Sequence, residues 1–266
     1  MYSKKDKMYV LAMPKNWAGM ENGMKNVVIM QARVGSSRLH AKVLKELFGK
    51  TILEHDIERI RQAKTIDDII VATTTSPHDD AIEDVAIRCG VKVFSGSEND
   101  VLDRYYQAAK KYNVDNIVRI TSDCPLIDPH VIDDVVKCFD DGEYEVITNV
   151  PNDAKFTYPR GLDVEEFSFE WLEKAWKEAT DKYDREHVSP YIYDHAVRKC
   201  YFQYDKDYSQ YRWTLDTEED WKVIQNIYEH FYHGKHDFYL EDIVKYVQDN
   251  PDISKINEMV KQKLKH

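Results

Sequence analysis

Short apolar runs alternate with helical patterns along the first part of the chain. The apolar runs have the length of buried strands, and they occupy residues 27–30, 69–73, 91–94, 116–120 and 145–149. Segments with apolar residues at helical spacing lie between them, at residues 52–63, 81–89, 101–112 and 132–139. Repeated crossovers of this kind favour an α/β fold in which helices cover both faces of a mostly parallel sheet.

The second half of the chain continues the pattern less regularly. It predicts helices at residues 171–179 and 219–231, strands at 201–204 and 212–215, and a helical tail at 253–264. Residues 1–24 show no clear periodicity before the first strand. We therefore expect an N-terminal extension there and a working fold that begins near Met24.

Composition narrows the range of partners. The chain has 266 residues and a net charge of −11, and phosphate backbones are held by basic surfaces, so we expect no nucleic-acid partner. No apolar run approaches the roughly 20 residues that span a bilayer, so we expect no membrane segment. The cysteines lie far apart, without a CxxC pair or a secretory leader. This favours a cytoplasmic location with reduced thiols at Cys89, Cys124, Cys138 and Cys200.

A polar loop rich in cations follows the first predicted strand. It spans residues 31–42 and reads QARVGSSRLHAK. Gly35 permits a tight backbone path that can turn N–H groups toward an anion, and Arg33, Arg38 and Lys42 supply three cations. The patterns of a Walker loop and of a dinucleotide fingerprint are both missing. We interpret the segment as a triphosphate-binding loop; the alternative is a solvated basic loop.

Two aspartates stand at the ends of predicted strands, where metal ligands are often found. Asp123 follows the strand that ends at Ile120, and Asp216 lies between a predicted strand and a helix. Because magnesium is commonly held by one or two carboxylates together with substrate phosphates, the pair predicts Mg²⁺ as cofactor. The alternatives are a turn aspartate at Asp123 and an ordinary capped acidic first turn at residues 217–220.

Seven segments, in order along residues 27 to about 230, carry a resemblance to a known family. They read QARVGSSRLHAKVL, VATTTSPHDDAI, GSENDVLDRYYQAA, VRITSDCPLIDP, PRGLDVE, DREHVSPYIY and RWTLDTEED. The chain resembles the SpsF-type cytidylyltransferases of spore-coat and surface-polysaccharide synthesis. These are related to the enzymes that activate 3-deoxy-manno-octulosonate and acylneuraminate with CTP. The resemblance implies a Rossmann-like nucleotide-diphospho-sugar transferase fold with a small inserted arm, a CTP donor and Mg²⁺.

The resemblance also suggests how the chain is divided. We expect residues 25–235 to form the nucleotidyltransferase domain, with an acceptor-side or dimerisation arm at about 150–212. Residues 236–266 are expected to form a helical segment packed on that domain. Tyrosines crowd the arm, and we expect a homodimer.

Carried over position by position, the resemblance places Arg33, Arg38 and Lys42 on the triphosphate, and Asp123 and Asp216 on the metal. Arg33, Lys42 and Asp123 are the expected catalytic residues. The predicted nucleotide-binding residues, of which the last four would lie near the base and ribose, are Gln31, Ala32, Arg33, Gly35, Ser36, Ser37, Arg38, Lys42, Thr73, Thr74, Ser97 and Glu98.

The loop departs from the family at two positions. The usual loop has proline and glycine where this chain has His40 and Ala41. Alanine tolerates a positive φ poorly, so we expect the closure of the loop to differ.

Two further segments predict the acceptor side of the site. They match family segments that line the acceptor side of the cleft, and their polar residues are Arg160, Asp163, Glu165, Arg185, Glu186 and His187. An arginine could pair bidentately with a carboxylate or phosphate, and His187 could relay a proton. The alternative is a structural cluster of salt bridges. The acceptor stays open between a keto-acid sugar, a sugar phosphate and a small phosphorylated or phosphonate compound.

Together these features predict transfer of CMP from CTP to a sugar acid or sugar-like acceptor. An acceptor oxygen would attack the α-phosphorus in line, and pyrophosphate would leave. The closest alternative is a metal-dependent glycosyltransferase that uses a finished nucleotide sugar and would leave CTP untouched. A second alternative is a noncatalytic nucleotide-binding subunit, which would bind CTP without turnover.

Overall fold

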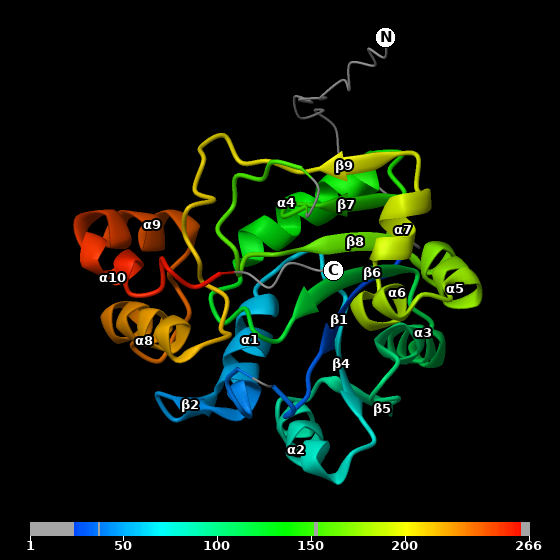
Figure 1. Cartoon of the computed structure of the whole chain (residues 1–266), viewed down its shortest axis with the longest axis horizontal. Coiled ribbons are helices and arrows are strands. Elements are labelled where there is room, and N and C mark those ends of the chain that lie inside the picture. Colours follow the sequence, from blue (N-terminus) through cyan, green and yellow to red (C-terminus); the bar gives the residue numbers. More distant parts are fainter. Residues whose placement is uncertain (1–23, 37, 152–153, 262–266) are drawn as a thin grey trace.

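A seven-stranded sheet lies at the centre of the molecule, in the strand order β5-β4-β1-β6-β8-β7-β9 (Figure 1). The computed structural model describes residues 24–36, 38–151 and 154–261. The strands are β1 (Asn26–Gln31), β4 (Asp68–Thr74), β5 (Lys92–Gly96), β6 (Asn116–Thr121), β7 (Val146–Thr148), β8 (Glu165–Ser168) and β9 (Lys199–Tyr201). β8 alone among them runs antiparallel to its neighbours β6 and β7, while the other pairs are parallel. The predicted mostly parallel sheet is therefore confirmed.

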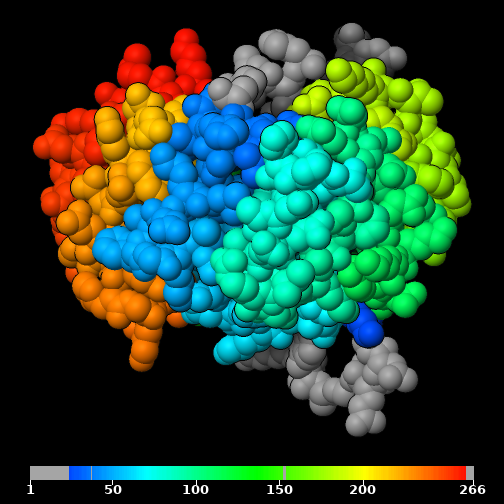
Figure 2. Space-filling model, turned by 90° about the horizontal axis from the view of Figure 1, so that it is seen from below, coloured from blue at the N-terminus to red at the C-terminus, as the bar shows by residue number. Residues whose placement is uncertain are grey.

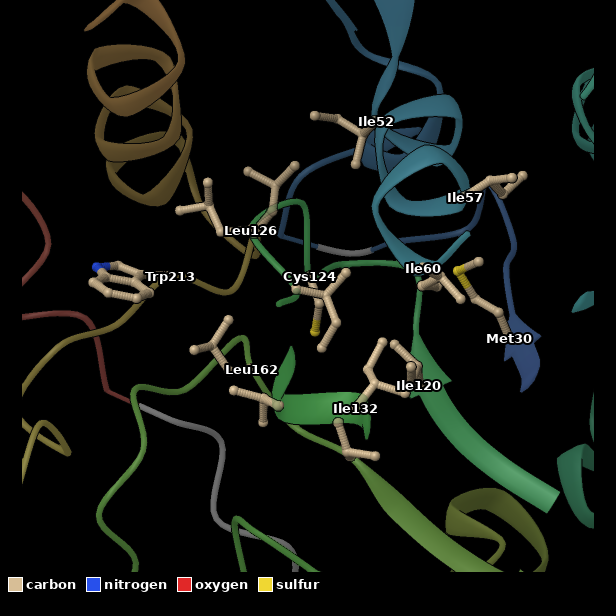
Figure 3. Packing of buried hydrophobic residues seen from close by; sticks show 14 of the residues in the cluster. Met30, Ile52, Ile57, Ile60, Ile120, Cys124, Leu126, Ile132, Leu162 and Trp213 are labelled. Carbon is tan, nitrogen blue, oxygen red and sulfur yellow. The ribbon is translucent and has the colours of Figure 1, made fainter. Parts of the chain in front are cut away.

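Both faces of this sheet are buried. Alternate residues of β1 point to opposite faces, so Val28 and Met30 join one core cluster while Val27 and Ile29 join the other. The first core, part of which is shown in Figure 3, is covered by α1 (Ile52–Ile60), α2 (Asp80–Arg88), α4 (Pro129–Asp141), α8 (Glu218–Phe231) and α9 (Leu240–Asp249). The second is covered by α3 (Val101–Tyr112), α5 (Phe169–Glu178) and α7 (Pro190–His195).

Shorter elements complete the described chain. They are η1 (Lys42–Leu44), the hairpin of β2 (Glu46–Leu47) and β3 (Lys50–Thr51), η2 (Pro77–Asp79), α6 (Lys182–His187) and α10 (Pro251–Lys255). Local side chains fix where several helices begin. Thr51 and Glu54 form a capping box at the start of α1, and the side chain of Asp128 accepts the His130 N–H at the start of α4.

Three predicted elements of the second half are wrong in part or in whole. Residues 212–215 form no strand, because their N–H groups find partners in loops: Trp213 donates to the Arg160 carbonyl and Leu215 to the Asp123 carbonyl. The strand predicted at 201–204 ends at Tyr201. The predicted helical tail ends at Lys255 and is not helical over 256–261, while 262–264 lie outside the described residues. The helical segment expected over residues 236–266 includes α9, although the pattern of apolar residues gave no separate prediction of this helix.

The division of the chain into an extension, a domain with an arm and a C-terminal segment stays a prediction, and residues 1–23 lie outside the described residues. Within the residues described, no helix is both long and apolar enough to cross a membrane.

Candidate functional site

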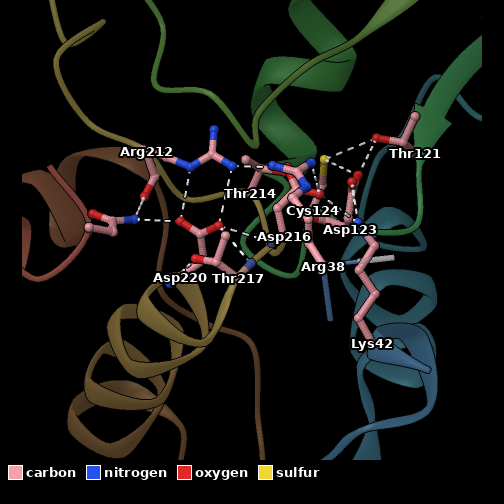
Figure 4. A network of polar contacts seen from close by, with 11 residues as sticks. Arg38, Lys42, Thr121, Asp123, Cys124, Arg212, Thr214, Asp216, Thr217 and Asp220 are labelled. Carbon is pink, nitrogen blue, oxygen red and sulfur yellow. Dashed lines mark hydrogen bonds and ion pairs between the residues drawn. The ribbon is translucent and has the colours of Figure 1, made fainter. Parts of the chain in front are cut away.

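Three segments meet at the carboxyl ends of β1 and β6 (Figure 4). They are the donor loop (residues 32–41) after β1, the turn at 121–124 after β6, and the segment 212–217 that leads into α8. Strands β1 and β6 end level with each other, since Gln31 pairs with Thr121. The Leu215 N–H donates to the Asp123 carbonyl over 2.8 Å, and the Thr214 hydroxyl donates to the same oxygen over 3.2 Å. These bonds bring Asp216 beside Asp123.

Lys42 joins the two aspartates. Its Nζ lies 2.8 Å from Asp123 Oδ2 and 2.9 Å from Asp216 Oδ1. Arg38 Nη2 lies 2.9 Å from the same Asp216 oxygen, and the Thr121 hydroxyl donates to Asp123 Oδ1 over 2.5 Å. Two predicted triphosphate cations and both predicted metal ligands thus form one charged cluster.

Burial and charge act against each other in this cluster. Burial disfavours the Lys42 ammonium, but Asp123 and Asp216 outweigh it and raise the pKa of Lys42 above its ordinary value. Burial likewise pushes the pKa of the Asp123 carboxyl upward, and Lys42 reverses the effect, so that the pKa is lowered. Both groups therefore hold their charges at neutral pH.

A second layer of contacts orients Asp216. Arg212 Nη2 lies 2.9 Å from Asp216 Oδ2, and Arg212 Nε lies 2.9 Å from Asp220 Oδ1. Asp220, which is 1% exposed, also accepts the Asp216 and Thr217 N–H groups in a capping box. The predicted capped first turn is thus confirmed, and it coexists with the cluster.

Asn257 reaches this layer from the C-terminal segment. Its Nδ2 donates to the Arg212 carbonyl and to Asp220 Oδ1, over 2.9 and 2.8 Å. The sequence reasoning missed Asn257 and the orienting role of Arg212, and it gave Asp220 only as part of a capped first turn. The spacing of Thr217 and Asp220 signals the cap, whereas nothing local marks Asn257, which lies 37 residues beyond its carboxylate partner.

The donor loop is tied to the neighbouring strand. Ala32 N–H donates to the Ala72 carbonyl over 3.1 Å, and Val34 N–H donates to Asp79 Oδ1 over 2.7 Å. Gly35 and Arg33 are exposed, and among the described residues Arg33 forms no ion pair. Ser37 lies outside the described residues.

Ala41, which stands where the usual loop of the family has glycine, adopts an uncommon backbone conformation. Ala41 adopts φ 51° and ψ 31°, the left-handed region, and its N–H donates to the Val34 carbonyl over 3.1 Å. The chain thus carries an alanine at a position that glycine occupies without strain.

The other predicted nucleotide residues lie at the ends of β1, β4 and β5. The Gln31 carbonyl accepts the Ser122 hydroxyl over 2.8 Å. Thr73 and Thr74 are almost fully buried, and the Thr74 hydroxyl donates to Asp79. The Ser97 hydroxyl oxygen accepts the Asp100 N–H over 3.1 Å in the turn before α3, and Glu98 is exposed. In the donor loop, the Ser36 N–H donates to the Val34 carbonyl over 2.7 Å.

Arg160 and Asp163 lie on a segment that runs beside residues 211–214. Arg160 N–H donates to the Tyr211 carbonyl over 3.2 Å, and the Arg160 guanidinium stacks over Phe156 at 4.6 Å from the ring centre. Burial raises the pKa of Asp163 to about 6 against the opposing charge of Arg160, and its Oδ1 is buried without a partner among the described residues. A cavity of about 170 Å³, lined in part by Arg160, Arg212 and Asn257, adjoins this segment.

The remaining predicted acceptor residues are engaged elsewhere or exposed. Glu165 Oε2 accepts from Arg119 Nη1 over 2.8 Å and from the Ser189 hydroxyl over 3.0 Å. Arg185 forms a bidentate pair with Asp100, and its Nη1 donates to the Trp176 carbonyl over 2.8 Å. Glu186 is exposed, and the His187 ring packs on Tyr183. For Glu165 and Arg185 these contacts favour the structural alternative.

The donor set of the cluster fits a hard cation. Asp123 and Asp216 approach each other closely enough to share one ammonium, and both present carboxylate oxygens. Among the described residues no group of three or more His, Cys, Asp or Glu side chains could hold a metal ion. Mg²⁺ is commonly bound by one or two carboxylates while phosphates and waters supply its other ligands, and this pair suits that arrangement.

Comparison with known proteins identifies the family. The cytidylyltransferase family matches residues 27–259. An uncharacterized protein, MJ1063, of Methanocaldococcus jannaschii is 43% identical over 244 residues, 90% of this chain and 97% of that protein. The spore coat polysaccharide biosynthesis protein SpsF of Bacillus subtilis is 31% identical over 231 residues, 84% of this chain and 94% of that protein. The solved structure of a cytidylyltransferase from Leptospira borgpetersenii superposes with a TM-score of 0.82 at 35% identity, over 92% of this chain and all of that one. This chain therefore belongs to the cytidylyltransferase family and is an SpsF-type, CTP-dependent nucleotidyltransferase.

Proposed function

We propose that the enzyme transfers CMP from CTP to a sugar acid or a similar anionic, sugar-like acceptor during the synthesis of a surface glycan. The observation that carries the proposal is the contact of Lys42 with both Asp123 and Asp216 near the carboxyl ends of β1 and β6. A cation and two carboxylates so arranged suit a phosphorus centre that must be attacked while its negative charges are offset. The kinship with SpsF supports a place in polysaccharide synthesis.

The reaction needs no covalent enzyme intermediate. An oxygen of the acceptor forms a bond to the α-phosphorus of CTP, the bond from that phosphorus to the bridging oxygen breaks, and pyrophosphate leaves. Lys42 would donate to the α-phosphate, while Arg33 and Arg38 would donate to the β- and γ-phosphates. Asp123 and Asp216 would hold Mg²⁺, which would supply positive charge to the phosphate oxygens.

Binding of the nucleotide requires an exchange of partners. Lys42 and Arg38 now contact the carboxylates that would hold the metal. When phosphates arrive, these cations would turn from Asp123 and Asp216 to the phosphate oxygens and leave the carboxylates available. The metal and the nucleotide would therefore each favour binding of the other.

Arg160 and Asp163 are the residues we propose for the acceptor. Arg160 makes no ion pair among the described residues and borders the cavity beside Arg212, so its fork is available to a carboxylate or phosphate. The unpartnered Oδ1 of Asp163 is available to an acceptor hydroxyl. A homodimer and a cytoplasmic location stay predictions from the sequence.

The proposal is tested by measuring pyrophosphate release from CTP with a panel of sugar acids, sugar phosphates and phosphonates, in the presence of Mg²⁺. We expect release with one acceptor class, and loss of release when the metal is chelated. Asp123→Asn should lower the rate about 100- to 1,000-fold without a comparable loss of melting temperature. Asp252→Asn is the matched control, because Asp252 is exposed and pairs only with Lys255 among the described residues.

Two results would contradict the proposal. Pyrophosphate release at a near-normal rate by Asp123→Asn would remove the metal assignment. A preference of the wild-type enzyme for UTP or dTTP would remove CTP as the donor.

A further inference from the structure

Two cysteines, Cys138 and Cys200, lie together on one face of the sheet. Cys138 stands in the last turn of α4, and Cys200 is the middle residue of β9. Cys200 pairs in register with Ile147 of β7, so the two side chains point to the same face, which α4 covers (Figure 1). Both cysteines are partly buried and pack against the same core as Ile147. Their side chains therefore meet between the helix and the edge of the sheet.

The two thiols hydrogen-bond each other, and the contact makes them unequal. The Cys200 S–H donates to the Cys138 sulfur and lowers the pKa of Cys138, against the opposing effect of burial. The same contact, together with burial, raises the pKa of Cys200, although the Tyr144 hydroxyl also donates to its sulfur. A cysteine with thiolate character beside a protonated one is typical of a dithiol that undergoes disulfide exchange.

The other two cysteines of the chain are different. Cys89 caps the C-terminal end of α2, and burial raises the pKa of its thiol. Cys124 is 1% exposed, and burial raises the pKa of its thiol as well. A raised pKa slows the attack of a thiol on a disulfide. Since Cys89 is partly exposed like Cys138, it serves as the internal comparison.

Cys138 and Cys200 enclose the proposed acceptor part of the chain. Residues 139–199 include Arg160, Asp163 and Arg185. This part ends in β9, a strand of three residues at the edge of the sheet that pairs with β7. Short elements at an edge open more readily than the core strands. A covalent bond from β9 to α4 would hold this edge, and it would restrict a long loop in the unfolded chain.

We propose that Cys138 and Cys200 form a reversible disulfide that fastens β9 to α4. The Cys138 thiolate attacks one sulfur of a low-molecular-weight disulfide, such as oxidised glutathione, and displaces one thiolate. Cys138 then carries no charge, so Cys200 ionises more readily, attacks the Cys138 sulfur of the mixed disulfide and displaces the second thiolate. The small disulfide gains two electrons and becomes two thiols, which take up the two protons that the cysteines lose.

This bond lies apart from the charged cluster of the candidate site. In the strand order, β9 is three positions from β6, whose end carries Asp123. At about 4.8 Å per strand, the separation across the sheet is roughly 14 Å. The thiols therefore react without displacing Lys42 or Asp123, and the inference does not depend on the donor or the acceptor in the proposed function.

The test exposes the full-length enzyme to glutathione buffers of increasing oxidised fraction, after which N-ethylmaleimide blocks the remaining thiols. We expect the chain to lose two of its four thiols, and a digest without reductant to yield a peptide that joins Cys138 to Cys200. The melting temperature should rise by about 5–15 °C and fall back when dithiothreitol is added.

Three variants separate the roles of the cysteines. Cys89→Ala is the matched control and should keep the full rise in melting temperature. Cys200→Ala should lose the rise and retain glutathione on Cys138, because the second thiol that displaces it is missing. Cys138→Ala should lose the rise and leave Cys200 a free thiol.

The wild type alone keeps the test decisive if a variant does not fold. At neutral pH, iodoacetamide should label Cys138 about 10-fold faster than Cys89, because more of Cys138 is thiolate. Three results in the wild type would each overturn the inference: no cross-link at any oxidised fraction, a reaction that stops at a glutathione adduct, or a disulfide that joins two chains. A full rise in melting temperature in Cys138→Ala would also overturn it.

Discussion

The proposed donor half of the site, formed by the donor loop with Lys42, Asp123 and Asp216, and its proposed acceptor half, around Arg160 and Arg185, use their charges differently. In the donor half, Lys42 and Arg38 contact Asp123 and Asp216, which are the very groups that the bound substrate would replace as partners. In the acceptor half, some charges are fixed by the fold, as in the bidentate pair of Arg185 with Asp100. Others, such as Arg160, have no ion-pair partner among the described residues. The contrast separates charged groups that would change partners when the substrate binds from charged groups that stabilise the fold.

Gly161 joins the two halves, and its substitution should have the largest effect. Its φ is +102°, and an added Cβ would come 2.5 Å from the Trp213 carbonyl carbon and the Thr214 nitrogen. Both atoms are backbone, so neither can move aside without displacing the segment that carries Asp216. We expect Gly161→Ala to lower the free energy of unfolding by at least about 4 kcal/mol, measured by urea denaturation.

Gly234→Ala is the control that separates the cost of backbone strain from the cost of a steric clash. Gly234 has a φ of +90°, but an added Cβ would meet nothing within 4 Å. It should therefore cost only the backbone term, about 1–2 kcal/mol. Equal losses in the two variants would mean that the close approach of Gly161 to residues 213 and 214 does not hold the halves together.

The second comparison lies within the acceptor half and pairs Arg185→Met with Arg160→Met. Arg185 uses its guanidinium on Asp100 and on the Trp176 carbonyl, so its loss should lower the free energy of unfolding by about 2 kcal/mol and leave the acceptor KM near its normal value. Among the described residues, the Arg160 side chain stacks on Phe156, worth about 0.5–1 kcal/mol, and its charge opposes the rise in the pKa of Asp163. The loss of Arg160 should instead raise the acceptor KM about 10- to 100-fold.

Chemical denaturation and acceptor titrations of the same two variants check this prediction. The reverse pattern, with acceptor affinity lost in Arg185→Met and stability lost in Arg160→Met, would exchange the two roles.

The regular first half of the fold could be predicted because its strands are buried on both faces. Apolar runs such as 27–30 and 69–73 then stand out from the helical patterns around them. Residues 212–215 misled the same reasoning, because a short run with Trp213 and Leu215 also has strand composition. Its hydrogen bonds go to Arg160 and Asp123 in loops, and only the tertiary fold supplies such partners.

The site could be predicted as far as its chemistry lies in short motifs. Lys42 and Asp123 lie in motifs that follow β1 and β6, Asp216 lies in the motif that leads into α8, and the structure brings the three together. Asn257 could not be found in this way. It orients Asp216 through Arg212 from a distant segment. This property depends on the folded chain and leaves no local pattern.

The smallest predicted effect tests the donor half itself. Ala41 ends the donor loop at φ 51°, where an L residue with a Cβ is strained. Ala41→Gly should raise the free energy of unfolding by about 0.5–1 kcal/mol, since relief of strain is partly offset by the greater freedom of glycine in the unfolded chain. Asn113→Gly is the matched control: Asn113 has φ 52° at the end of α3, and asparagine tolerates this region better, so the gain should be close to zero. Thermal denaturation of both variants measures the difference. If Ala41→Gly is instead less stable than the wild type, the end of the loop is adapted to alanine. Lys42 and Arg38 would then change partners less readily than their contacts indicate.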